Sequence, residues 1–126
     1  MPYDDLMAQT EFFTEAPAEV LAELASRGTE RALIRGDVLF HEGDNAESMY
    51  LLMSGRIAII IANPLDSRET VVSLMEHGDL FGEMSMLDHQ PRSATARALE
   101  ASRLLEIPFE PVATAFKNDP TMLWGV

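Results

Sequence analysis

The residues best suited to bind a ligand lie in the segment 77–98. Gly82 precedes a run, 83–87, that can form one or two helical turns. Glycine lets the backbone approach a ligand closely, and the first N–H groups of a helix are free donors that favour an anion. Arg92 follows on the next predicted strand, and a guanidinium can grip a phosphate with two parallel charge-assisted hydrogen bonds. With the hydroxyl of Ser93 beside it, the segment predicts an anion-binding loop.

Glu83 requires a different role, because a carboxylate repels a phosphate. We expect it to accept a hydrogen bond from a sugar hydroxyl. One acceptor for a ribose 2′-OH and one arginine for a singly charged phosphodiester form a matched pair for a compact nucleotide. Arg92 would also offset the charge of Glu83, so that the empty site holds no uncompensated carboxylate. The alternative is a surface Glu–Arg pair that closes a loop, worth only about 0–1 kcal/mol, and the residue types leave both interpretations open.

Between residues 29 and 108 the sequence has the rhythm of a β protein. Short β-prone runs are separated by turn residues at fairly even intervals. The runs are 38–41, 49–53, 56–62, 70–75, 94–98 and 103–107. This pattern predicts an antiparallel sandwich or barrel. Both faces of the run 56–62 are largely apolar, so we expect that strand to be covered on both sides or to line a pocket.

Helical patterns flank this region. In 1–28 we expect a short helix with an apolar plug, followed by a helix between Pro17 and Gly28. The residues expected to pack against the rest of the fold are Leu6, Met7, Phe12, Phe13, Val20, Leu21 and Leu24. The segment 109–126 begins with another helix, which ends before Pro120, and its apolar face holds Val112, Ala115 and Phe116. An apolar stretch, 121–124, then begins, and we expect a truncated form of a longer protein, since such a face needs a cover.

The composition fits one compact domain over residues 1–126. Nine Lys and Arg against 21 Asp and Glu give a formal net charge of −12, which repels nucleic acid and anionic membranes at long range. The absence of cysteine excludes a disulfide, a thiolate zinc site and a cysteine nucleophile. The longest apolar run, 57–62, is too short to span a bilayer. We therefore expect a cytoplasmic protein that binds neither DNA nor membrane through this chain.

No catalytic or metal site is predicted. His41, His77 and His89 are scattered, without the pairing that metal ligands show. No paired general acid and base and no nucleophile motif accompany them. We therefore expect no enzymatic activity and no metal or cofactor. Met84 and Met86 are expected to pack the short helix of the loop.

The ordered motifs of the chain resemble a known family. FGEMSML at 81–87 followed by PRSAT at 91–95 is similar to the phosphate-binding cassette of cyclic nucleotide-binding domains. These domains occur in catabolite activator (Crp/Fnr-type) regulators, in the regulatory subunits of cyclic-AMP-dependent kinase and in gated channels. The likeness extends upstream through RGD at 35–37, EGD at 42–44, SMYL at 48–51 and SGRI at 54–57. It therefore covers nearly the whole chain.

The resemblance implies a fold and a set of ligand contacts. The fold would be mainly β, an eight-stranded antiparallel β-roll (jelly roll, or double-stranded β-helix) with helices at both ends. Glu83 matches the family's acidic residue on the ribose 2′-OH, and Arg92 matches its phosphate-binding arginine. The neighbouring positions that complete the predicted ligand-binding set are Gly82, Met84, Ser85, Ser93 and Ala94. Candidate walls of the base pocket are Ile59, Ile61 and Val72, for which a role in the core alone is the alternative.

The resemblance also implies a function. The chain would be a cyclic nucleotide sensor, with cyclic AMP as the expected ligand and cyclic GMP as the alternative, and the N-terminal regulatory part of a Crp/Fnr-type transcription regulator. A homodimer would form through a long C-terminal helix that also caps the base, and the sequence ends before that helix. Two alternatives stay open: a ligand-free β-roll that serves as an interaction or dimerisation module, and the regulatory domain of a kinase, channel or other enzyme.

Overall fold

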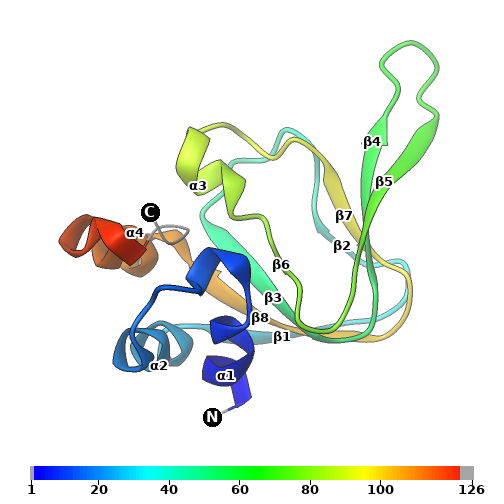
Figure 1. The fold of residues 1–126 in the computed structure, drawn as a ribbon. Coiled ribbons are helices and arrows are strands. Elements are labelled where there is room, and N and C mark those ends of the chain that lie inside the picture. Colours follow the sequence, from blue (N-terminus) through cyan, green and yellow to red (C-terminus); the bar gives the residue numbers. More distant parts are fainter. Residues whose placement is uncertain (1, 123–126) are drawn as a thin grey trace.

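The computed structural model describes residues 2–122, which form two four-stranded antiparallel sheets (Figure 1). The first sheet has the strand order β1-β8-β3-β6, formed by Thr29–Leu33, Ser102–Pro108, Ser48–Ser54 and Leu80–Phe81. The second sheet has the order β2-β7-β4-β5, formed by Val38–Phe40, Thr95–Ala98, Ile57–Ala62 and Glu69–Met75. Most neighbouring strands are not consecutive in the sequence, as in a jelly roll. The predicted fold class, an antiparallel β-roll with flanking helices, is confirmed.

The helices gather on the side of the first sheet (Figure 1). α1 (Pro2–Ala8), the 3-10 turn η1 (Glu11–Phe13) and α2 (Ala18–Ser26) precede the roll. α4 (Phe109–Asn118) and the 3-10 turn η2 (Pro120–Met122) follow it, and α3 (Met84–Asp88) lies between β6 and β7. Within residues 2–122, none of the helices combines the length and the apolar content that crossing a bilayer requires. The second half of the predicted apolar stretch 121–124 lies outside the described residues.

Strand β3 is buried on both faces because it lies between two hydrophobic clusters. Side chains alternate along a strand, so Met49 and Leu51 pack against the helices while Tyr50 and Leu52 face the second sheet. The helical side contributes most of the residues predicted to pack there, namely Leu6, Met7, Phe12, Phe13, Leu21, Leu24, Val112 and Phe116. The predicted apolar plug is thereby confirmed, since Met7 and Phe13 are fully buried.

All six predicted runs are strands, with ends that agree within one residue, but two strands were not predicted. β1 reads Thr-Glu-Arg-Ala-Leu, and only Leu33 is buried, so it lacks an apolar alternation. β6 has only two residues. In β4 the expected cover on both sides holds for the first part of the strand, because Ile57, Ala58 and Ile60 are buried, whereas Ile61 and Ala62 are exposed.

Candidate functional site

A concavity of about 180 Å³ lies beside α3, over strands of the second sheet. It contains all seven residues of the predicted ligand-binding set: Gly82, Glu83, Met84, Ser85, Arg92, Ser93 and Ala94. The remaining lining residues come from β2, β4, β5 and β6, and they are Phe40, Ile59, Ser73, Met75 and Phe81. The fold therefore brings the two halves of the predicted loop, on either side of α3, to one hollow.

Of the three candidate base-pocket walls, only Ile59 lines this concavity. Ile61 lies farther along β4, in the β4–β5 hairpin that projects beyond the other strands (Figure 1), and this residue is 39% exposed. Val72 is 52% exposed. It is the bulged residue of β5, because Ile59 pairs with Ser73 and Ile60 pairs with Val71, which leaves Val72 without a partner in the ladder. Such a bulge changes which side chains face inward. Ser73 and Met75 therefore line the concavity, where Ile61 and Val72 were expected.

Gly82 allows the closest approach in the site. Its φ of +81° lies in the left-handed region that side-chain-bearing residues rarely adopt. A Cβ at this position would lie 2.8 Å from Nη1 of Arg92. The glycine is therefore required by the backbone conformation and by the space that the guanidinium occupies.

Arg92 is a buried charged residue, with only 5% of its surface exposed. Its Nη1 donates to the carbonyl of Gly82 at 2.8 Å, and its Nη2 donates to the carbonyl of Ser48 at 2.5 Å. Its Nε is buried and has no partner among the described residues. Burial lowers the pKa of the guanidinium, an effect that Tyr50 opposes most, followed by Glu106 and Asp44. A guanidinium titrates so far above neutrality that Arg92 stays charged, so the site holds a buried cation with a free donor.

An aromatic platform that was not predicted from the sequence supports this cation. The Cζ atom of Arg92 lies 4.2 Å from the ring centroid of Phe40 and 5.6 Å from that of Tyr50. Phe40, on β2 of the second sheet, stacks on Tyr50 with ring centroids 5.7 Å apart, and Phe81, on the paired strand β6, has its ring centroid 5.6 Å from that of Tyr50. Arginine above an aromatic ring gains cation–π stabilisation. The signal available was one aromatic residue in each of two predicted strands, Phe40 and Tyr50, and a third, Phe81, directly before Gly82 in the loop motif.

Glu83 and Arg92, both in the described part of the chain, form no ion pair, so the predicted compensation of one charge by the other is wrong. The guanidinium is bonded to two backbone carbonyls instead. Glu83 lies at the N-cap position of α3, and its side chain makes no capping hydrogen bond. It also borders a second hollow near η1 and is partly buried. Burial raises the pKa of its carboxyl above the ordinary value.

The two methionines of the loop behave differently. Met86 packs against the helical cluster, as expected. Met84 is 53% exposed at the edge of the concavity, so the expectation that it packs the short helix is wrong. Ser93 is exposed as well and lines the same hollow.

The family model of the cyclic nucleotide-binding domain matches residues 30–119 of the chain. The chain belongs to the cyclic nucleotide-binding domain family. The match includes both halves of the loop, Glu83 and Arg92 among them, and the resemblance inferred from the motifs is confirmed. The match begins at Glu30 and ends at Asp119, so α1, η1, α2 and η2 lie outside it.

Three relatives illustrate the range of the family. A cyclic AMP receptor protein of Thermus thermophilus is 39% identical over 93 residues, which cover 73% of this chain and 42% of that protein. The N-terminal domain of a transcriptional regulator from Streptomyces coelicolor has a TM-score of 0.81 at 32% identity, and the match covers 94% of this chain and 82% of that one. The regulatory domain of PKA from Toxoplasma gondii, solved with cAMP, has a TM-score of 0.83 at 26% identity, covering 89% and 42%. This chain thus spans less than half the length of the Thermus relative.

In this cyclic nucleotide-binding domain, the raised pKa of Glu83 predicts a pH-dependent stability. The folded chain favours the protonated carboxyl, so this contribution to stability is present below the unfolded-state pKa and is lost as the pH rises through the folded-state pKa. Glu83→Gln is therefore expected to raise the unfolding temperature near neutral pH, with a gain that vanishes in acid. Thermal unfolding followed across pH measures this difference. The exposed Glu19→Gln is the control for the lost charge, and an equal gain in both variants would contradict the burial argument.

Proposed function

We propose that this chain senses cyclic AMP and forms the regulatory part of a Crp/Fnr-type transcription regulator. The observation that carries the proposal is the buried Arg92 with its unpartnered Nε, in the same hollow as Glu83. A buried cation gains most from a ligand that brings one negative charge, and a cyclic phosphodiester brings one. A buried donor without a partner is costly until a ligand supplies an acceptor.

The ligand would use the free groups of the site. The phosphate would accept from Nε of Arg92 and from one of its remaining terminal N–H groups, in the side-on bidentate geometry that guanidinium favours. Ser93 would add a hydroxyl donor. The ribose 2′-OH would donate to the ionised carboxylate of Glu83. The concavity is small for a whole nucleotide, so the base would extend past Ile59 along β4, toward Ile61.

The site is connected to the helices through α3. Met86 and Leu87 of this helix pack against the cluster that contains residues of α1, α2 and α4. A ligand that shifts α3 would therefore shift the packing of these helices, and it would bias an attached output domain toward the conformation that it binds better.

The choice of ligand and output rests on the relatives. The Thermus protein is described as a cyclic AMP receptor, and the Toxoplasma domain was solved with cAMP. The Streptomyces domain is part of a transcriptional regulator. A bacterial transcription regulator binds DNA in the cytoplasm, so the proposal includes a cytoplasmic location. The homodimer expected through a further C-terminal helix stays a prediction.

A second candidate is the regulatory domain of a kinase. The observation that favours it is the TM-score of 0.83 with the Toxoplasma PKA domain. The coding sequence that surrounds this chain distinguishes the two, since a helix-turn-helix domain supports the transcription regulator. Titration with cyclic nucleotides distinguishes the ligand-free interaction module, which would bind none of them.

Calorimetry with cyclic AMP and cyclic GMP tests the proposed function. We expect saturable binding of cyclic AMP that weakens in Glu83→Gln by about tenfold, since a hydrogen bond to a charged group is lost. The 2′-deoxy analogue should bind the unsubstituted chain and Glu83→Gln with nearly equal affinity, because it lacks the donor. An equal loss for ribose and deoxyribose ligands would refute the role of Glu83. No heat with either nucleotide at millimolar concentration would refute the sensor and favour the interaction module.

A further inference from the structure

Arg92 occupies the place where the pairing of β3 with β6 ends. The last pair of that ladder joins Tyr50 to Phe81. On the other side of β3, the N–H of Phe109 donates to the carbonyl of Glu47, so Ser48 and its opposite residue on β8 form a pair without mutual hydrogen bonds. The carbonyl of Ser48 therefore points away from β8, toward the side of β6, where the described strand has no residue left to donate to it. Arg92 supplies the missing donor.

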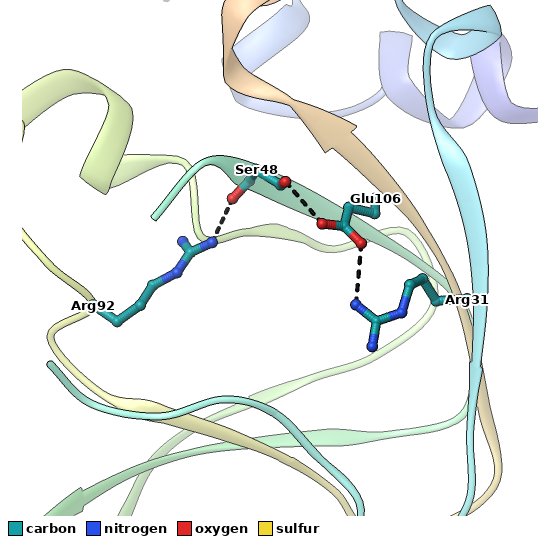
Figure 2. Close-up of polar contacts among 4 residues, drawn as sticks. All are labelled: Arg31, Ser48, Arg92 and Glu106. Carbon is teal, nitrogen blue, oxygen red and sulfur yellow. Dashed lines mark hydrogen bonds and ion pairs between the residues drawn. The ribbon is translucent and has the colours of Figure 1, made fainter. Parts of the chain in front are cut away.

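A chain of side chains continues from Ser48 through the first sheet (Figure 2). The hydroxyl of Ser48 donates to Oε2 of Glu106 at 2.8 Å, and Nη1 of Arg31 donates to Oε1 of the same carboxylate at 3.0 Å. Both carboxylate oxygens are thus engaged, one by β3 and the other by β1. The side chains of Arg31 and Glu106 are 37% and 27% exposed, so water screens this pair only in part.

The charged groups along this chain of contacts carry a net positive charge, which favours the binding of an anion. Glu106 alone would neutralise Arg92 and would repel a phosphate beside it. Arg31 compensates the carboxylate, so the three groups together keep one positive charge at the site. Glu106 nevertheless stabilises the buried guanidinium while no ligand is bound.

We propose that Ser48, Glu106 and Arg31 are positioning residues for the ligand, which act through Arg92. They fix the first residue of β3, so that its carbonyl holds Nη2 of Arg92 and leaves Nε to the phosphate. This inference deepens the proposed function and rests on it. It assigns a role in binding to three residues that lie outside the concavity.

The test measures cyclic AMP binding by calorimetry in the 126-residue chain. Ser48→Ala removes the hydroxyl and keeps the carbonyl, and we expect it to weaken binding about fivefold to twentyfold. Ser48→Thr keeps the hydroxyl and should bind within about twofold of the unsubstituted chain. Glu106→Ala should also weaken binding, although the loss of a negative charge would by itself strengthen the binding of an anion. Tighter binding by Glu106→Ala, or binding by Ser48→Ala within about twofold of the unsubstituted chain, would overturn the proposal.

Arg103→Gln is the matched control for Arg31→Gln. Arg103 and Glu30 also join β8 to β1 by an ion pair, at 3.2 Å, but their side chains are 66% and 55% exposed and neither belongs to the Ser48 contacts. Both variants remove one positive charge from the same two strands. We expect weaker binding only in Arg31→Gln, and equal losses in the two variants would overturn the proposal.

A second readout needs no ligand. The Nε–H resonance of Arg92 reports on how firmly its guanidinium is held, and we expect it to shift or broaden in Ser48→Ala and Glu106→Ala but not in Arg103→Gln. If no form of the chain binds a cyclic nucleotide, the sensor proposal fails while this resonance still tests the positioning. An unchanged resonance in Ser48→Ala and Glu106→Ala would overturn the inference even if the chain binds cyclic AMP.

Discussion

Arg92→Ala is expected to abolish cyclic AMP binding in a calorimetric titration. The change removes the only buried cation of the concavity and with it the partner of the phosphate, a loss of about 2–5 kcal/mol of binding free energy. It also leaves the carbonyls of Ser48 and Gly82 without their donor, so we expect a loss of about 1–3 kcal/mol in the free energy of unfolding.

Arg97→Ala is the control for this experiment. Arg97 lies on β7 shortly after Arg92 and pairs with Glu69 through two hydrogen bonds, of 3.0 and 2.9 Å, at the surface. Its loss should leave the affinity unchanged. Arg92→Lys keeps the charge but lacks the fork that bridges two carbonyls, and its affinity should remain far below that of the unsubstituted chain. Binding by Arg92→Ala at the original affinity would remove the basis of the proposed function.

Gly82→Ala is expected to have the second largest effect, and mainly on binding. The φ of +81° costs about 1 kcal/mol of folding free energy in alanine. The added Cβ also lies 2.8 Å from Nη1 of Arg92, so the guanidinium must move from the place where it meets the ligand. We expect the affinity for cyclic AMP to fall at least about tenfold, because small displacements of a binding group are costly.

Gly36→Ala is the control that separates the cost of the positive φ from the steric clash with Arg92. Gly36 has a φ of +93°, but a Cβ there meets nothing within 4 Å. Gly36→Ala should therefore lose only the stability that the positive φ costs, Gly82→Ala should lose at least as much in chemical denaturation, and only Gly82→Ala should lose affinity. Equal affinities in the two variants would show that the guanidinium is not held where the ligand needs it.

Much of the fold follows from the sequence because its central strands carry a strong signal. β3 and β4 are apolar on both faces, and turns that contain glycine separate several of the strands. β1 escaped prediction because its side chains are mostly exposed at the edge of the sheet, where pairing with β8 supplies the stabilisation. β6 escaped because two residues are too few for a pattern.

The candidate site was only partly predictable. Gly82, Glu83 and Arg92 have residue types that indicate their chemistry, and the fold brings them to one hollow. The partners of Arg92 are backbone carbonyls, which every residue has, so no residue type could reveal them. Glu106 is separated from Ser48 by 58 positions, and only the register of β3 with β8 brings them together.

The pairing of β1 with β8 has a consequence for how the protein is made. Arg31 and Glu106, which meet across these strands, are 75 positions apart, and β8 also separates β1 from β3 in the sheet. A nascent chain that has not yet released β8 from the ribosome therefore lacks the middle of its first sheet, and loop closure over such a distance slows folding. Until β8 is available, β1 has no partner strand and one edge of β3 is unpaired, and such edges are sites at which another chain can pair.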